Sequence, residues 1–171
     1  MRERMRVPFP SWHWVRSDPH RLLVFGFGAG LLRPGSGTWG TLMAWALWLI
    51  FARHLSSNVF GIFLIAAYIY GSWACNRVAE ELQVADHVGM VWDEIAAFWL
   101  LLWLLPGQLA VQLAAFALFR VFDTLKPPPI RYFDARFKNG FGVMWDDLLA
   151  AIYAAVLVTL ALRAGWFNGV V

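Results

Sequence analysis

Apolar residues in this chain gather in segments that are separated by polar or Gly/Pro-rich stretches. Ala, Leu and Trp dominate these segments, and none shows the strict alternation of apolar and polar residues that is typical of a half-buried strand. The pattern therefore predicts helices at residues 41–51, 59–75, 95–105, 109–119 and 148–162. Several are shorter than the roughly 20 residues that an upright transmembrane helix needs, so we expect them to tilt, to re-enter the membrane or to be lengthened by flanking polar turns.

The composition places these helices in a membrane. Hydrophobic residues make up 60% of the 171 residues, and 11 residues are Trp, which is more apolar surface than one small soluble domain can bury. We therefore expect an all-α fold, a compact membrane-embedded helical bundle with short, partly re-entrant apolar helices. Because no linker separates two domains, residues 22–171 are expected to form one domain after a basic and aromatic arm at 1–21.

The dipeptide Pro106-Gly107 decides the topology, because it splits the apolar stretch 95–119. This stretch could be one kinked span or two short antiparallel helices joined by a turn. The acids at 93–94 can share a site with residues 120–126 only if the chain returns to the same side of the membrane. We therefore favour the hairpin.

Basic residues indicate the orientation. The arm carries five Arg, the stretch 120–138 adds further Arg and Lys, and the turn at Pro106 has none. By the positive-inside rule, the arm and the acidic clusters face the cytoplasm. Trp12, His13 and Trp14 then suit an anchor at the level of the lipid headgroups, although an ordinary disordered N-terminal arm is an alternative. The formal net charge is only +3, and we expect no nucleic-acid partner.

Acidic residues precede the apolar segment 95–105. Asp86, Met90 and Asp93 are spaced to share one face of a helix that leads into this segment, with His87 and Glu94 on an adjacent face. Helix-start chemistry is an alternative explanation, because carboxylates near a helix N-terminus cap free N–H groups and complement the helix dipole.

A second group of charges follows the segment 109–119. Arg120, Asp123 and Lys126 recur every three residues, as in an ion-pair ladder on a solvated helix face. Three prolines then end the helix and hold Arg131 and Asp134 at a fixed offset from it. A rigid corner of cations and acids suits a phosphorylated, metal-bound ligand, although an electrostatic corner at the membrane surface remains an alternative.

Two adjacent carboxylates, Asp146 and Asp147, begin the last apolar segment. Helix capping explains one of them, but two acids beside an apolar surface repel each other unless a cation compensates. Mg²⁺ is the natural cation, since it prefers oxygen ligands and bridges to phosphate. Thiolate or imidazole sites are disfavoured because Cys75 is the single cysteine and the histidines lack a paired ligand spacing.

A Gly/Thr-rich stretch at 34–41 precedes the first apolar helix. Its N–H groups and hydroxyls, Thr38 included, could bind an anion at the start of that helix. Close packing of membrane helices through small residues explains the same glycines equally well.

Taken together, the motifs at 26–31, 37–42, 91–94, 119–127, 129–131 and 142–147 resemble the phosphatidylglycerophosphatase A family in order and spacing. The resemblance covers about residues 22–160. It implies an enzyme of the bacterial inner membrane, and the apolar segments and basic residues described above predict that this enzyme is multi-pass, with its active site facing the cytoplasm. This enzyme would remove the terminal phosphate of phosphatidylglycerophosphate, an anionic phospholipid, with Mg²⁺ as cofactor, to give phosphatidylglycerol.

The resemblance also assigns the site, position by position. Catalytic and metal-binding roles fall on Asp93, Glu94, Asp123, Asp146 and Asp147. The matched cations, which would bind phosphate, are Arg120, Lys126 and Arg131, and Asp134 is a further matched acid that could support the site. The residue patterns described above add Thr38 as a phosphate-binding candidate and Asp86 and His87 as supporting residues. In the mechanism that we expect, carboxylates hold Mg²⁺ and another carboxylate accepts a proton from the attacking water. His87 is a candidate proton donor, although a solvated histidine is the simpler expectation.

Two other functions compete with this hypothesis. An ion-coupled transporter would place acids near the middle of its spans, whereas the acids here lie at segment ends. An enzyme of the CDP-alcohol phosphotransferase type would also use Mg²⁺ in a membrane, but it needs an Asp-Gly-rich motif, and the chain contains no Asp-Gly.

Overall fold

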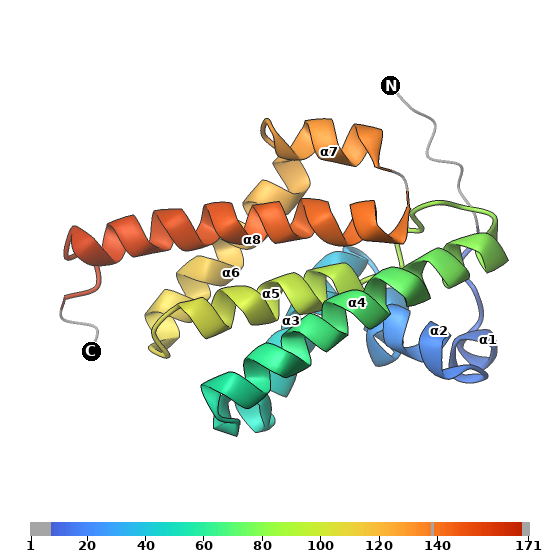
Figure 1. Ribbon diagram of the computed structural model, residues 1–171, viewed down its shortest axis with the longest axis horizontal. Helices are drawn as coiled ribbons and strands as arrows, with labels where there is room; N and C mark the ends of the chain where they lie inside the picture. Colours follow the sequence, from blue (N-terminus) through green and yellow to red (C-terminus); the bar gives the residue numbers. More distant parts are fainter. Residues whose placement is uncertain (1–7, 138, 169–171) are drawn as a thin grey trace.

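A computed structural model describes residues 8–137 and 139–168, apart from the side chains of residues 134 and 135. This part of the chain is helical and has no β-strand, which confirms the all-α prediction. The elements, labelled in Figure 1, are α1 Trp12–Arg16, α2 Pro19–Val24, the 3₁₀ helix η1 Gly26–Leu31, α3 Ser36–Ile50, the 3₁₀ helix η2 Ala52–His54, α4 Ser57–Leu82, α5 Trp92–Leu104, α6 Leu109–Leu125, α7 Ile130–Arg136 and α8 Gly140–Arg163.

Helices α5 and α8 form the centre of the bundle. α8 packs against α4, α5, α6 and α7, while α5 also packs against α3 and α4. Small buried residues of α8, Ala150, Ala151 and Ala154, let the neighbouring helices approach closely. Each predicted apolar segment lies within a helix or ends one residue beyond it.

The turn between α5 and α6 reverses the chain, so the predicted hairpin is correct and the single kinked span is wrong (Figure 1). The buried Gln112 of α6 stabilises this turn. Its amide donates a hydrogen bond to the carbonyl of Gly107 at 3.1 Å and accepts one from the Trp45 indole of α3 at 2.7 Å. As a result, the start of α5 and the end of α6 lie at the same end of the helix pair.

The segment between α4 and α5 is a loop, and the predicted helical face through Asp86 and Asp93 is therefore wrong. α5 begins only at Trp92. The backbone N–H of Val91 bonds instead to the carbonyl of Val24, at 2.9 Å. Gly89 lies directly against the backbone of η1, too close for a side chain. These contacts replace the hydrogen bonds that a longer helix would make.

His87 is buried within this loop rather than solvated as we expected. Its Nδ1 accepts a hydrogen bond from the N–H of Gly89 at 3.0 Å, and its ring lies 4.9 Å from the Phe9 ring and 5.8 Å from the Phe25 ring. Packing against the Phe9 and Phe25 rings thus accounts for the burial of His87.

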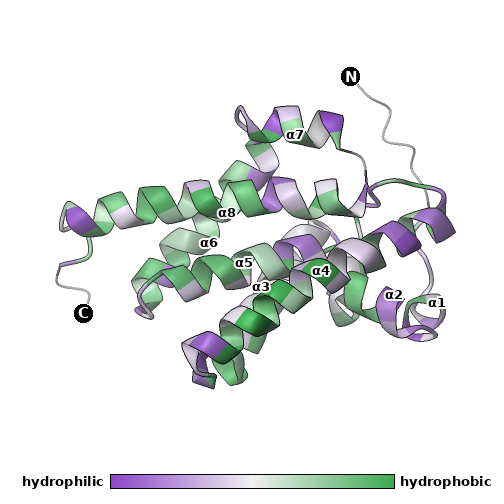
Figure 2. Cartoon of the chain, viewed as in Figure 1, coloured by the Kyte–Doolittle hydropathy of each residue, from purple (hydrophilic) through white to green (hydrophobic). Residues whose placement is uncertain are grey.

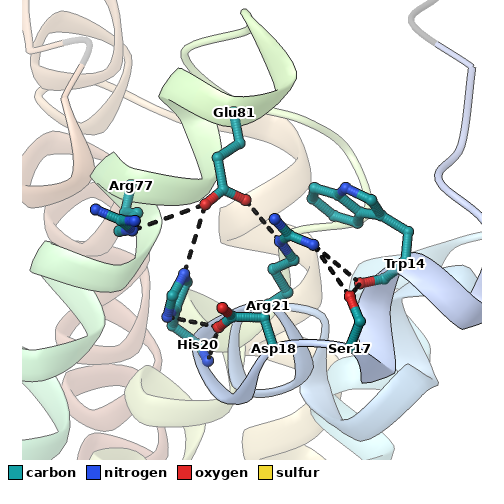
Figure 3. Close-up of polar contacts among 7 residues, drawn as sticks. All are labelled: Trp14, Ser17, Asp18, His20, Arg21, Arg77 and Glu81. Atoms are coloured by element: carbon teal, nitrogen blue, oxygen red, sulfur yellow. Dashed lines mark hydrogen bonds and ion pairs between the residues drawn. The ribbon is translucent and has the colours of Figure 1, made fainter.

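The N-terminal helices are attached to the C-terminal end of α4 by a polar network (Figure 3). The Glu81 carboxylate accepts a hydrogen bond from Arg21 Nε at 2.6 Å and lies 3.5 Å from His20 Nε2 and 3.7 Å from Arg77 Nε. Asp18 caps α2 by accepting from the His20 N–H. The N-terminal arm is therefore packed against the bundle from α1 onward. The boundary that we expected between the arm and the domain, after residue 21, falls inside α2.

Two helices, α4 and α8, are long and apolar enough to cross a membrane. They carry exposed apolar side chains such as Ile62, Ile65 and Ile69 on α4 and Val156 and Leu160 on α8. In Figure 2, green dominates α5 and the C-terminal half of α8, whereas polar residues gather in α2 and at the C-terminal end of α4. These features indicate a membrane protein.

Candidate active site

A cluster of three carboxylates lies where the first turn of α5 meets the second turn of α8. One oxygen each from Asp93, Glu94 and Asp147 lies within 4.8 Å of the other two. Asp93 is only 7% exposed and Asp147 only 3%. We call these three residues the acidic triad.

Asp93 and Glu94 lie in the first turn of α5, where carboxylates also complement the helix dipole, but helix capping does not explain Asp146 and Asp147. The residue at the N-cap of α5 is Val91, and α8 is capped by Asn139, whose side chain accepts a hydrogen bond from the N–H of Gly142 at 2.9 Å. Because α8 begins at Gly140, Asp146 and Asp147 lie well inside the helix. These buried acids therefore have another role.

Cations from α6 connect the acids of the neighbouring helices. Nη1 of Arg120 lies 2.9 Å from Oδ2 of Asp123 on the same helix and 3.8 Å from Oε1 of Glu94 on α5. Lys126, at the end of α6, forms an ion pair with Asp146 of α8. The expected ladder along α6 is present between Arg120 and Asp123, and Lys126 bridges to a different helix.

The start of α3 forms one wall of the site. A Cβ atom on Gly37 would overlap the Glu94 carboxylate and lie 2.9 Å from Nη2 of Arg120. The buried Thr41 hydroxyl donates to the Gly37 carbonyl at 2.8 Å and lies 3.4 Å from Nη1 of Arg120. Sequence reasoning missed the roles of Gly37 and Thr41, although the Gly-Thr spacing in this stretch was a visible signal.

The chemistry of the acidic triad fits a hard divalent cation. Burial, opposed in part by a hydrogen bond from Asp93, raises the pKa of Glu94 to about 7. Burial and the nearby charges of Glu94 and Asp147 raise the pKa of Asp93 well above its usual range. Oδ1 of Asp93 and Oε2 of Glu94 are buried and have no hydrogen-bond partner among the described residues. Mg²⁺ would satisfy these oxygens and offset the repulsion.

The structure does not bring every predicted site residue to the acidic triad. Arg131 is exposed on α7 and forms no ion pair with the acids whose side chains are described. Asp86 is exposed in the loop before α5, and Thr38 is half-buried in the first turn of α3. Asp134 belongs to α7, but its side chain lies outside the described part of the structure. Their roles stay predictions.

The sequence of this chain matches a known protein family. The family model described as phosphatidylglycerophosphatase A matches residues 22–162, a range that contains the acidic triad and the cations of α6. The chain belongs to the phosphatidylglycerophosphatase A family. Members of this family are enzymes of the phosphoric monoester hydrolase class, and so is this protein.

Individual relatives support the same assignment. The chain is 46% identical over 143 residues to the phosphatidylglycerophosphatase A of Haemophilus influenzae, a match that covers 82% of this chain and 87% of the relative. It is 36% identical over 140 residues to the phosphatidylglycerophosphatase A of Escherichia coli, with 81% of each chain covered. No solved structure matches the chain.

Proposed function

We propose that this protein removes the terminal phosphate of phosphatidylglycerophosphate in a Mg²⁺-dependent reaction, giving phosphatidylglycerol and inorganic phosphate. The observation that carries this proposal is the placement of Asp93, Glu94 and Asp147 beside Arg120, with Lys126 paired to Asp146, the neighbour of Asp147. Three carboxylates that lie close together are suited to bind a metal ion, and cations beside them are suited to bind a phosphate group. The names of the two relatives supply the lipid.

Asp93, Glu94 and Asp147 would hold the metal. When bound, Mg²⁺ would polarise the phosphate group and lower the pKa of a bound water molecule. The guanidinium of Arg120 and the ammonium of Lys126 would bind phosphate oxygens and offset the charge that develops on them. Asp123 and Asp146 hold these two cations in place by the ion pairs described above.

The reaction that we propose is a direct displacement by water. The water oxygen forms a bond to phosphorus, and the ester bond between phosphorus and the glycerol oxygen breaks. A carboxylate that is not holding the metal, Asp123 or Asp146, accepts the proton of the attacking water. The glycerol oxygen takes up a proton and remains on the lipid, while phosphate leaves.

The membrane explains how such a substrate reaches the site. The exposed apolar faces of α4 and α8 would contact acyl chains, which keeps the phosphorylated headgroup at the membrane surface. Arg and Lys side chains beside that surface attract anionic lipid. We accordingly place the protein in the inner membrane with the site on the cytoplasmic side.

The decisive experiment measures phosphate release from phosphatidylglycerophosphate in detergent micelles, with Mg²⁺ and with excess EDTA. We expect turnover with Mg²⁺, loss of turnover in EDTA and recovery when Mg²⁺ is restored. Turnover that persists in EDTA would contradict the metal requirement. Absence of turnover on this lipid by folded, Mg²⁺-loaded protein would contradict the substrate.

The orientation has its own test in single-cysteine variants, with the buried Cys75 replaced by Ala. Gly107 is exposed in the turn after α5, and Arg136 is exposed at the end of α7. A membrane-impermeant thiol reagent added to intact cells should label Gly107→Cys and not Arg136→Cys. The opposite pattern would place the site on the outer side.

A further inference from the structure

Tyr68 of α4 carries a buried hydroxyl that has no hydrogen-bond partner among the described residues. A buried tyrosine hydroxyl normally finds a partner. Tyr68 lies four residues after Leu64 and three before Gly71, both buried, so it belongs to the inner face of α4. An unpaired donor on this face calls for an explanation.

The surroundings of Tyr68 connect it to the acidic triad. One residue earlier, the Ala67 carbonyl accepts a hydrogen bond from the Trp92 indole at 3.1 Å, and Trp92 directly precedes Asp93. One turn later, Gly71 packs against Trp92 and against Met144, which lies three residues before Asp147. The hydroxyl of Tyr68 is close enough to Asp147 and Asp93 to interact electrostatically with both carboxylates.

The site therefore has two chemically different sides. Arg120 and Lys126 approach from α6 and are the groups suited to a phosphate. Tyr68 approaches from α4, beside Asp93 and Asp147, and brings a neutral donor in place of a charge. A neutral donor suits a water oxygen, and Mg²⁺ in proteins usually keeps several of its waters.

We propose that Tyr68 is a positioning residue of the metal site, whose hydroxyl donates a hydrogen bond to a water held beside Asp93 and Asp147 when the site is loaded. This inference rests on the proposed function. Hydrogen bonds of this kind orient the ligands of a metal, and their loss typically costs about 10- to 100-fold in metal affinity or activity.

The test compares Tyr68→Phe with the wild-type protein, each stripped of metal with EDTA and then freed of EDTA. Calorimetric titration with MgCl₂ without substrate should show about 10- to 100-fold weaker binding by the variant. At saturating Mg²⁺ the KM for the lipid should change little, because the phosphate contacts remain. Tyr70→Phe is the matched control, since Tyr70 lies on the same helix and is 41% exposed.

A second measurement separates this role from a structural one. Because the hydroxyl is unpaired in the metal-free protein, Tyr68→Phe should unfold at the same temperature as the wild type or higher without Mg²⁺, and it should gain less thermal stability from added Mg²⁺. Equal Mg²⁺ affinity in Tyr68→Phe and wild type would overturn this inference alone. A wild-type protein that binds no Mg²⁺ would overturn the proposed function and this inference with it.

Discussion

Gly37 and Glu94 are in direct contact across the interface between α3 and α5, and a side chain at position 37 would occupy the place of the Glu94 carboxylate. The same Cβ atom would lie 2.9 Å from Nη2 of Arg120. Because Gly37 has no side chain, the start of α3 can pack against both Glu94 of the acidic triad and Arg120, a candidate phosphate-binding residue. This relationship links Gly37 of the Gly/Thr-rich stretch to the chemistry of the site.

Replacing Gly37 with Ala should impair catalysis more than folding. The atoms that a methyl group displaces are the ends of flexible side chains, which can move aside, but a misplacement of about 1 Å in a catalytic group can cost on the order of 10²-fold in rate. We expect kcat to fall by about that factor with a small change in melting temperature. Gly107→Ala, where nothing lies within 4 Å of the added atom, is the control, and equal kcat in the two variants would contradict the prediction.

Neutral replacements should separate the metal-binding acids from the others. Asp147→Asn should raise the Mg²⁺ concentration needed for half-maximal activity, because it removes a charged metal ligand. Asp123→Asn should lower kcat by at least about 10²-fold at every Mg²⁺ concentration, since Asp123, which pairs with Arg120 and hydrogen-bonds to Asp147, is a proposed proton acceptor rather than a proposed metal ligand. Glu80→Gln, an exposed position near the end of α4, should change neither quantity. The same Mg²⁺ dependence in both aspartate variants would disprove the division of roles.

Arg120 should not tolerate lysine. Its guanidinium reaches Asp123 at 2.9 Å, Glu94 at 3.8 Å and the Thr41 hydroxyl at 3.4 Å, a set of partners that a single ammonium group cannot match. We expect Arg120→Lys to raise KM and to lower kcat, in steady-state assays at saturating Mg²⁺. Arg163→Lys, an exposed position at the far end of α8, provides the control. Full activity in Arg120→Lys would show that only the charge matters.

The metal-free protein should lose stability as the pH rises. Glu94 has a pKa of about 7 in the folded state and 4.5 as a free side chain, so the folded protein retains a proton that the unfolded chain has released between these values. Unfolding then releases protons, and the free energy of unfolding decreases as the pH rises through this range. The melting temperature in EDTA should therefore fall between about pH 5 and about pH 8.

Two comparisons check the origin of this pH effect. Glu94→Gln should flatten the dependence, because the amide does not titrate. Added Mg²⁺ should also reduce it, since a cation offsets the burial of ionised carboxylates. A melting temperature that rises with pH in EDTA would contradict the assignment.

The apolar pattern alone located the main helices because the content of apolar residues in a segment and its helical pattern are local properties of the chain. Pro106-Gly107 marked the break between α5 and α6, but the choice of a turn over a kink depended on the expectation that the acids share one site. The loop before α5 escaped prediction for a physical reason. Its backbone bonds to Val24 and packs on η1, and such partners are distant in sequence and outweigh the local spacing of Asp86 and Asp93.

The sequence also predicted which types of residue form the site. Acids and cations in an apolar chain are costly, so their presence indicated a polar site, and oxygen ligands indicated a hard metal. Which of them meet was decided only by the tertiary structure. Crossing of α5, α6 and α8 joins Asp147 to Asp93 and Lys126 to Asp146, and the approach of α3 and α4 adds Gly37 and Tyr68. Contacts between helices depend on packing across the whole chain, and no local pattern encodes them.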